Sequence, residues 1–403
     1  MNSNADVAYG QTILARGIRS RFVDNGNACT LHVLEAGFER PGRPCVVLLH
    51  GFPELAFSWR RVLLPLAQAG FHVVAPDLRG YGRSSGTDVS FDDELLPFSF
   101  LNGVCDILGL VHALRLREVA AIVGHDHGSP LAAWCALARP DVFRSLVMIS
   151  APFGGPPPAP VNVANQPAPE TAAPATSIYD DLAALPVPRK HYQKFYATRA
   201  ANDDMWRAPQ GVHDFLRGYY HMKSADWTDN RPFPLQARAA SEWARLPRYY
   251  VMDLHKGMAQ TVAPAMPSTH EIAACSWLSD EELAVYSGEY RRNGFQGALQ
   301  SYRVKWMPRY TPEQTLFAGR TVDVPSLFIG GKSDWGVYQT PGAVEKMQNT
   351  GCTRFQGVHL LEGAGHWVQQ EQSQALNELL LAFLRQGESA WGTPAGGTQS
   401  ARV

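Results

Sequence analysis

The sequence predicts an α/β fold in which helices flank a mostly parallel central sheet and a helical segment is inserted between two strands. Short apolar runs alternate with longer helical stretches, and the runs lack polar alternation, as strands buried on both faces do. These runs are CVVLLH, FHVVAP, VAAIVG and SLVMIS, and VDVPSLFIGG resumes the pattern beyond residue 320. Ahead of them, residues 17–37 hold two alternating runs around a turn at 24–27, which predicts an antiparallel hairpin.

The composition is typical of a soluble globular protein that acts on a small molecule. The chain has 403 residues, of which 45% are hydrophobic, so it can bury a large core. Its 36 basic residues nearly balance its 37 acidic residues, which disfavours nucleic acid and anionic membranes as partners. No apolar run approaches the roughly 18 residues that span a bilayer. We therefore expect no membrane anchor and a small neutral substrate.

The cysteines indicate neither a metal site nor a disulfide framework. They are scattered and form no C-x-x-C pair, which fits a reducing cytoplasm. The first residues lack the basic and apolar regions of a secretion signal, which supports the same location. We expect a cytoplasmic protein without a metal or an organic cofactor, and nothing in the sequence excludes a homo-oligomer. The six cysteines are Cys29, Cys45, Cys105, Cys135, Cys275 and Cys352.

The order of the patterns divides the chain into a core and an insertion. We assign residues 1–153 and 317–387 to the two parts of the core, because both carry the alternation of strand and helix. Residues 154–316 form a helical cap rich in Tyr and Trp, and its first part, 154–176, is a Pro/Ala-rich linker. Residues 388–403 are small and polar enough to form a flexible tail.

The most informative motif places Asp126 between a strand and a helix. In VAAIVGHDHG, an apolar strand runs into Gly-x-Asp-x-Gly, the context of a nucleophile elbow. The two glycines permit a turn so sharp that the central side chain projects from the sheet edge. A carboxylate nucleophile suits displacement at an sp³ carbon, where it forms an alkyl ester, whereas attack on an ester would give an anhydride. The residue type therefore indicates the reaction class.

A serine version of this motif, GRSSG at residues 82–86, competes with it. We reject it because the preceding strand ends too early, near Asp77. The residues that follow have no apolar periodicity with which to begin a helix.

Further candidate residues follow other strands. Asp334 comes just after FIGG, and His366 lies in a short loop past another strand, so His366 is predicted to take a proton from water while Asp334 orients its ring. Upstream, the backbone amide of Phe52 in HGFPE and that of His127 are predicted to form an oxyanion hole. Pro53 is a candidate for a cis peptide bond in this turn.

Together, HGFPE with SWR, DLRGYGRS, GHDHG, KSD and GAGHW resemble the soluble epoxide hydrolase branch of the α/β-hydrolases, over residues 15–385. The resemblance implies an α/β-hydrolase fold and conversion of an epoxide and water to a vicinal diol through a hydroxyalkyl ester on Asp126. It also implies that two cap tyrosines, Tyr192 and Tyr302, donate hydrogen bonds to the epoxide oxygen. We expect Pro53 and Trp367, which adjoin the motifs, to line the pocket of a mostly apolar epoxide.

The sequence departs from this family at two positions. His127 stands where Trp is common, which changes the pocket wall and its response to pH, and Ser129 stands where a second Gly is common. The cap is also long. The preferred epoxide therefore does not follow from the resemblance.

Several other interpretations compete with these. Asp126 and Asp334 could be helix or loop caps, and His125 with His127 could suggest a metal site, but no third ligand stands nearby and His125 is better explained as structural. The cap tyrosines could serve packing alone. For the whole chain, the rivals are a haloalkane or haloacid dehalogenase that uses the same Asp nucleophile, and a catalytically silent ligand-binding α/β-hydrolase.

Overall fold

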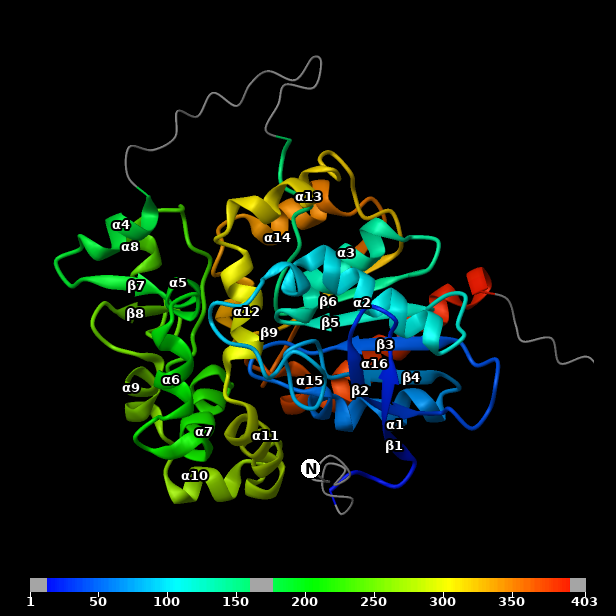
Figure 1. Ribbon diagram of the computed structural model, residues 1–403, viewed down its shortest axis with the longest axis horizontal. Helices are drawn as coiled ribbons and strands as arrows, with labels where there is room; N and C mark the ends of the chain where they lie inside the picture. The colour runs from blue at the N-terminus through cyan, green and yellow to red at the C-terminus, as the bar shows by residue number, and fades with distance from the viewer. Residues whose placement is uncertain (1–12, 160–176, 392–403) are drawn as a thin grey trace, which may run out of the picture.

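The central sheet organises the molecule. The computed structural model describes residues 13–159 and 177–391. Within them, eight strands form one sheet in the order β1-β2-β4-β3-β5-β6-β9-β10 (Figure 1). The strands are β1 (Ile18–Asp24), β2 (Thr30–Ala36), β3 (Cys45–Leu49), β4 (His72–Pro76), β5 (Ala121–His125), β6 (Leu146–Ile149), β9 (Ser326–Gly331) and β10 (Phe355–Leu361).

The strand pairing confirms the predicted fold class. β1 and β2 form the expected antiparallel hairpin, and β2 is antiparallel to β4. Every other neighbouring pair, from β4 across to β10, is parallel. β3, β5 and β6 are buried along their whole length, which explains why their sequences show no polar alternation.

Helices cover both faces of the sheet. α2 (Phe100–Ala113) and α3 (Gly128–Ala138) pack together on one face, and α1 (Arg60–Gln68) packs with α16 (Ser373–Trp391) on the other (Figure 1). Shorter helices of the core are α14 (Ala343–Lys346) and α15 (Val368–Glu371), and α13 (Thr311–Thr315) belongs to the chain between β6 and β9. Tighter or wider turns are η1 (Ala56–Trp59), η2 (Leu96–Phe98), η3 (Ala263–Ala265), η4 (Pro308–Tyr310), η5 (Trp335–Val337) and the π-helical η6 (Met347–Gly351).

The chain between β6 and β9 contributes no described strand to the central sheet. We call residues 177–316 the cap segment; it lies to one side of the sheet (Figure 1, green to yellow). It is largely helical, as predicted, and it also holds a two-stranded sheet that the sequence did not indicate. Its elements are α4 (Ile178–Ala183), β7 (Arg189–His191), α5 (Tyr192–Tyr196), α6 (Ala200–Trp206), α7 (Gly211–Lys223), α8 (Ala240–Trp243), β8 (Val251–Asp253), α9 (Met258–Val262), α10 (Thr269–Ala274), α11 (Asp280–Asn293) and α12 (Gln296–Val304).

Local sequence signals set some of these boundaries. Ser279 caps α11 in a capping box with Glu282, which satisfies backbone N–H groups at the start of the helix. The division of the chain at residues 153, 316 and 387 stays a proposal. Most of the predicted linker, residues 160–176, lies outside the described residues, as do residues 392–403 of the predicted tail. α16 continues to Trp391, so the first four residues of that predicted tail are helical.

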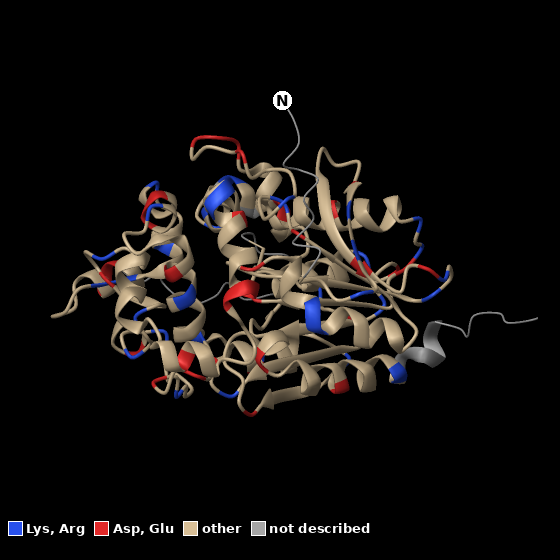
Figure 2. Cartoon of the chain, turned by 90° about the horizontal axis from the view of Figure 1, so that it is seen from below, with Lys and Arg blue, Asp and Glu red and all other residues tan. Residues whose placement is uncertain are grey.

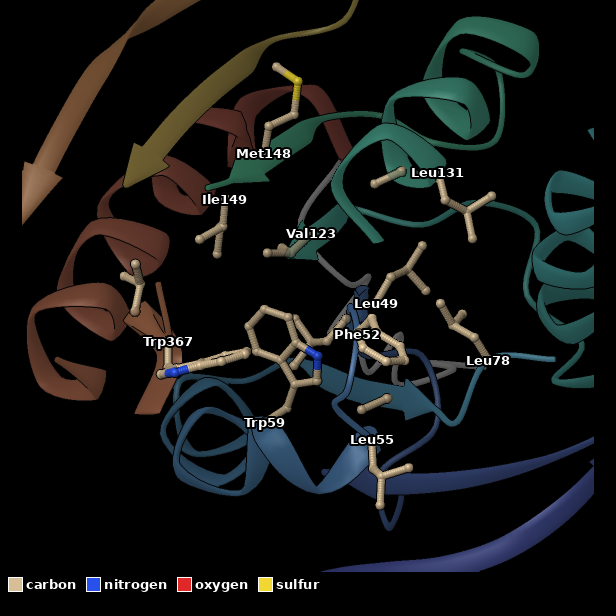
Figure 3. Close-up of a cluster of buried hydrophobic side chains, with 14 of the residues drawn as sticks. Leu49, Phe52, Leu55, Trp59, Leu78, Val123, Leu131, Met148, Ile149 and Trp367 are labelled. Carbon is tan, nitrogen blue, oxygen red and sulfur yellow. The ribbon is translucent and has the colours of Figure 1, made fainter. Parts of the chain in front are cut away.

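The core lies against the sheet and reaches the carboxyl ends of its strands. Figure 3 shows Leu49, Val123 and Ile149 packed in one cluster with Phe52 and Trp367, residues that adjoin the candidate site. Acidic and basic residues are both scattered over the elements visible in Figure 2, in keeping with the balanced charge. Among the described helices, none has both the length and the apolar character needed to cross a bilayer.

Candidate active site

Asp126 lies at a sharp turn between β5 and α3. Its backbone φ is +50°, a left-handed conformation that is rare for a residue other than glycine. Glycine is needed on both sides of Asp126 because other backbone atoms lie so close that no side chain would fit. A Cβ at Gly124 would lie 2.0 Å from the carbonyl oxygen of Gly128, and one at Gly128 would lie 2.5 Å from that of Leu49. The strand-turn-helix context expected for a nucleophile elbow is therefore present.

The loop after β3 meets this turn. The backbone N–H of Phe52 donates to Oδ1 of Asp126 at 3.1 Å. A Cβ at Gly51 would lie 2.3 Å from Cβ of Asp126, so only glycine allows the loop to come this close. The peptide bond between Phe52 and Pro53 is cis, as expected. Phe52 thus has the position of an oxyanion-hole donor, while the contribution of the His127 amide stays a prediction.

His366 stands between two carboxylates. Its Nε2 is 3.2 Å from Oδ2 of Asp126, and its Nδ1 donates to Oδ1 of Asp334 at 3.1 Å. Oδ1 of Asp334 also accepts the N–H of Gly336 at 2.7 Å, which fixes the carboxylate. The contact of Nε2 with Asp126 lacks hydrogen-bond geometry, and Nε2 has no hydrogen-bond partner among the described residues. In the neutral imidazole, this nitrogen is therefore free to accept a proton from a water molecule.

The pKa directions follow from these contacts. Burial alone would raise the pKa of Asp126, but interaction with His366 and the nearby charge of Lys223 hold it well below its usual range. Burial would likewise raise the pKa of Asp334, which is lowered mainly by His366. Burial and Lys223 lower the pKa of His366, yet the two carboxylates outweigh them and raise it. In the resting site, Asp126 is an anion beside an imidazole that favours its protonated form.

A second buried pair, His125 and Glu54, is hydrogen-bonded to the backbone of His366. Nε2 of His125 donates to the backbone carbonyl of His366 at 2.7 Å, and Nδ1 of His125 lies 2.5 Å from Oε2 of Glu54. Oε1 of Glu54 accepts hydrogen bonds from Gln369 and Gln370, at 2.7 and 3.1 Å. Both ring nitrogens of His125 are thereby occupied, in agreement with the structural role expected for it. No group of three or more His, Cys, Asp or Glu side chains suited to a metal occurs in residues 13–159 and 177–391.

The loop that carries His366 is also bonded to the cap segment. The N–H of His366 donates to the carbonyl of Lys223, the last residue of α7, at 2.8 Å. The carboxylate of Glu371 accepts the N–H groups of Gly365 and Trp367, and that of Ala225 in the cap segment. Core and cap segment therefore meet at the candidate general base.

The two candidate tyrosines lie together in the cap segment. Their rings are 6.3 Å apart, and the ring of Tyr302 is 5.6 Å from that of Phe52. Burial raises the pKa of both phenols well above the usual value, and the charge of Asp126 contributes in the same direction. Both hydroxyls are thus protonated and lie within the electrostatic reach of Asp126. Their predicted role as donors is not tested by this geometry alone.

His127 and Trp367 differ in how they relate to the site. The ring of His127 stacks on Phe100, with centroids 5.3 Å apart, and both border a small pocket between α2 and the loop after β4. The side chain of Trp367 is buried, and its Nε1 donates to the carbonyl of Tyr220. Its ring lies 4.7 Å from that of His366, and its place in the substrate pocket stays a prediction. Pro53 is also buried, and its contact with substrate stays a prediction.

The rejected serine motif lies away from this turn. Ser84 donates to the carbonyl of Asp77 and accepts the N–H of His32, which fixes it in the loop after β4. No helix begins directly after it, so the structure agrees with the rejection.

A doubly flanked parallel sheet, an acidic residue at the nucleophile turn and a histidine between two carboxylates together define a hydrolase of the α/β type. The family model described as the alpha/beta hydrolase fold matches residues 44–372. The chain belongs to the α/β-hydrolase family and, within it, to the epoxide hydrolase-like group, as the following relatives show.

An epoxide hydrolase of Caballeronia sordidicola is 30% identical over 89% of this chain and 92% of its own length. Epoxide hydrolase B of Mycobacterium tuberculosis is 31% identical over 85% of this chain and 91% of its own. Among solved structures, an epoxide hydrolase from an endophytic Streptomyces has a TM-score of 0.71 at 30% identity, with 92% of this chain and 96% of that chain covered. Potato (Solanum tuberosum) epoxide hydrolase I has a TM-score of 0.67 at 29% identity, covering 92% and 99%.

Three residues of the site could not be recognised from the sequence. Glu54 lies within HGFPE and Glu371 lies five residues after His366, so proximity to a motif was the only available signal. Lys223 lies in YYHMKSADW, where nothing distinguishes it from a surface lysine. Only the fold brings these residues to His366.

Proposed function

We propose that this protein hydrolyses a small epoxide to a vicinal diol through a covalent ester on Asp126. The observation that carries the proposal is the arrangement around one carboxylate. An ionised Asp126 projects from the elbow, an amide donor and an imidazole contact its two oxygens, and two protonated phenols lie within reach of its charge. The epoxide hydrolase relatives support the same activity.

In the first step, a carboxylate oxygen of Asp126 attacks one oxirane carbon and the bond from that carbon to the ring oxygen breaks. The electron pair goes to this oxygen, which becomes an alkoxide and takes a proton from Tyr192 or Tyr302. A donor is needed because an alkoxide is a strongly basic leaving group. The raised pKa of each phenol keeps its proton in place until the alkoxide forms.

In the second step, water attacks the ester carbonyl of Asp126. His366 accepts a proton from this water, and Asp334 stabilises the resulting imidazolium. The oxyanion that forms on the former Oδ1 accepts the N–H of Phe52, with His127 proposed as the second donor. The imidazolium then protonates the departing alcohol oxygen, and the proton of the new carboxyl group returns to the tyrosinate. The balance is one epoxide and one water consumed for each diol.

The environment also supports a mostly apolar substrate. Aromatic rings of Phe52, Tyr192, Tyr196 and Tyr302 contact one another, and the backbone N–H of Phe52 donates to Asp126. Such a wall binds hydrocarbon substituents and excludes water from the reacting carbon. A cytoplasmic location and assembly into a homo-oligomer stay predictions from the sequence.

The decisive experiment traps the ester. His366→Gln protein is mixed with terminal, aromatic and internal epoxides and, separately, with haloalkanes, and its intact mass is recorded. We expect a gain equal to one whole epoxide, mapped to the peptide that holds Asp126. The control His359→Gln, which changes an exposed histidine of β10, should turn over without accumulating an adduct. A second control, Asp126→Asn with His366→Gln, should gain no mass.

Other outcomes identify the rivals. A gain equal to a haloalkane minus its hydrogen halide would make the protein a dehalogenase. No adduct from either set would contradict catalysis through Asp126 and favour a silent binding protein.

A further inference from the structure

Lys223 is a buried cation without an ionic partner. Its side chain at the end of α7 is 3% exposed. Among the described residues, its ammonium forms neither a hydrogen bond nor an ion pair. Instead, four aromatic rings surround it, with Nζ lying 5.2 to 6.0 Å from their centroids. They belong to Trp367, Tyr219, Tyr250 and Tyr249.

Burying an ammonium group in this way is unfavourable in free energy unless other groups compensate. Removing an ammonium from water carries a penalty of several kcal/mol, and a cation-π contact returns roughly 0.5 to 2 kcal/mol. Burial lowers the pKa of Lys223, and the carboxylates of Asp126, Asp334 and Glu54 oppose this shift because each favours the charged form. Lys223 is therefore a counter-charge to the acidic residues of the site.

The position of Lys223 relative to His366 is fixed at the backbone. The carbonyl of Lys223 accepts the N–H of His366 at 2.8 Å. Glu371 binds the N–H of Ala225, two residues after Lys223, and that of Gly365, just before His366. The backbones that carry Lys223 and His366 thus belong to one hydrogen-bonded unit.

Esterification changes the charges that His366 experiences. In the resting site, Asp126 and Asp334 both favour its protonated form. An ester on Asp126 carries no negative charge, so only Asp334 then favours the imidazolium, while burial and Lys223 oppose it. The protonation equilibrium of His366 therefore shifts toward the neutral imidazole at the hydrolysis step, which requires a base.

We propose that Lys223 is a positioning residue whose positive charge keeps His366 unprotonated while the ester stands on Asp126. This inference rests on the proposed function and deepens it, because it assigns the charge that prepares the second step. Lys223 acts through His366 and forms no bond to the substrate.

Other groups also lie close to His366, among them Ser150, which donates to its carbonyl, and the ring of Trp367. His125 packs against it with ring centroids 5.0 Å apart, and the charge of Glu54 lies on the far side of His125. Glu371 binds the backbone of the same loop. Since these groups are identical in the variants compared below, their contributions cancel in the comparison.

The first test needs no substrate. Asp126→Asn imitates the neutral ester, and NMR of protein with labelled histidine side chains follows the titration of His366, assigned by comparison with His366→Gln. Adding Lys223→Met should move the His366 titration to higher pH. Adding Lys223→Arg, which keeps the charge, should leave it near that of Asp126→Asn alone. The matched control is Lys190→Met, which removes a cap-segment ammonium that packs on Phe195 instead of at the site.

A titration that stays in place or moves to lower pH in Asp126→Asn with Lys223→Met overturns the inference. Should Lys223→Met fail to fold, Lys223→Gln removes the same charge with a polar side chain and faces the same criterion.

The second test measures ester hydrolysis in single turnovers between pH 5 and 9. Lys223→Met should hydrolyse the ester roughly threefold to tenfold more slowly at the acidic end and approach the wild-type rate at the alkaline end. A loss of equal size at every pH would indicate a structural role and contradict the inference. If no epoxide forms an ester at all, the proposed function fails, and the NMR comparison still decides whether Lys223 governs the charge of His366.

Discussion

Glu371 accepts the backbone N–H of Trp367 through Oε1 at 2.8 Å, directly after the candidate general base. Its other oxygen accepts the N–H of Gly365 at 2.9 Å, directly before that base, and the N–H of Ala225 at 2.7 Å. One carboxylate therefore fixes the backbone on both sides of His366. An amide has only one accepting oxygen and cannot satisfy all three donors.

Glu371→Gln should therefore slow ester hydrolysis about 5- to 100-fold, because a buried backbone N–H left without its acceptor costs roughly 1 to 3 kcal/mol. Burial raises the pKa of Glu371 to about 8, so the loss is that of a neutral acceptor. Ester formation should change by no more than a few fold, since Asp126 is held by other contacts. Rapid-quench kinetics separates the two steps. Glu378→Gln, at an exposed position of α16, is the matched control, and equal losses in both steps would argue against a role confined to His366.

Tyr192→Phe and Tyr302→Phe should each slow ester formation about tenfold, and the double variant should slow it at least about 100-fold, because one phenol can partly replace the other as the proton donor. The rate is read from mass gain in the His366→Gln background. Tyr196→Phe serves as control, since its hydroxyl donates to Tyr219 instead of facing Asp126. A double variant as fast as this control would remove both tyrosines from the mechanism.

His127 should not contribute to the pH dependence of activity. Burial lowers the pKa of its imidazole to about 3, so the ring is neutral at any pH above roughly 5. His127→Phe keeps a flat ring against Phe100 and should preserve the shape of the kcat/KM profile between pH 5 and 9. This result would correct the expectation that His127 changes the response to pH. A displaced limb of the profile would show that His127 titrates in this range.

Glu35 should stabilise the protein above pH 4.5. It is 0% exposed in β2 and pairs with Arg19, Arg21 and His72. Burial opposes ionisation, but His72 and the two arginines lower the pKa of Glu35 from 4.5 to about 2. Because its folded-state pKa is depressed, its contribution is present above 4.5 and is lost as the pH falls toward 2.

Glu35→Gln should accordingly lower the free energy of unfolding at pH 7 by roughly 2 to 3 kcal/mol. The difference from wild type should shrink as the pH falls below 4.5. Urea unfolding at pH 7, 4 and 3 provides the measurement, with the exposed Glu378→Gln as control. A difference that stays constant with pH would assign the effect to packing instead of to charge.

Much of the fold could be predicted because its signals are local. Buried parallel strands produce unbroken apolar runs, and the glycines around Asp126 are required by backbone contacts near 2 Å for any added Cβ. The nucleophile, the acid and the histidine each follow a strand, and parallel strands bring their carboxyl ends to one edge. Their placement together therefore needed no long-range information.

The parts that could not be predicted depend on distant contacts. Lys223 is 143 residues from His366 in sequence, and nothing local shows that its carbonyl accepts the N–H of that histidine. The burial of Trp367 depends on the carbonyl of Tyr220, which no periodicity reveals. The β7–β8 pair is only three residues long in each strand, too short to produce a recognisable alternation.

The attachment of the His366 loop to residues 223 and 225 limits how substrate range could be altered by recombination. A chimaera that carries the cap segment of a relative would keep the Asp126 turn. However, it would replace the residues at positions 223 and 225, whose backbone groups bind His366 and Glu371. Breakpoints that retain α7 through Ala225 with the host core would leave that junction intact. Substituting individual aromatic residues of the cap segment is therefore the safer way to change which epoxide is accepted.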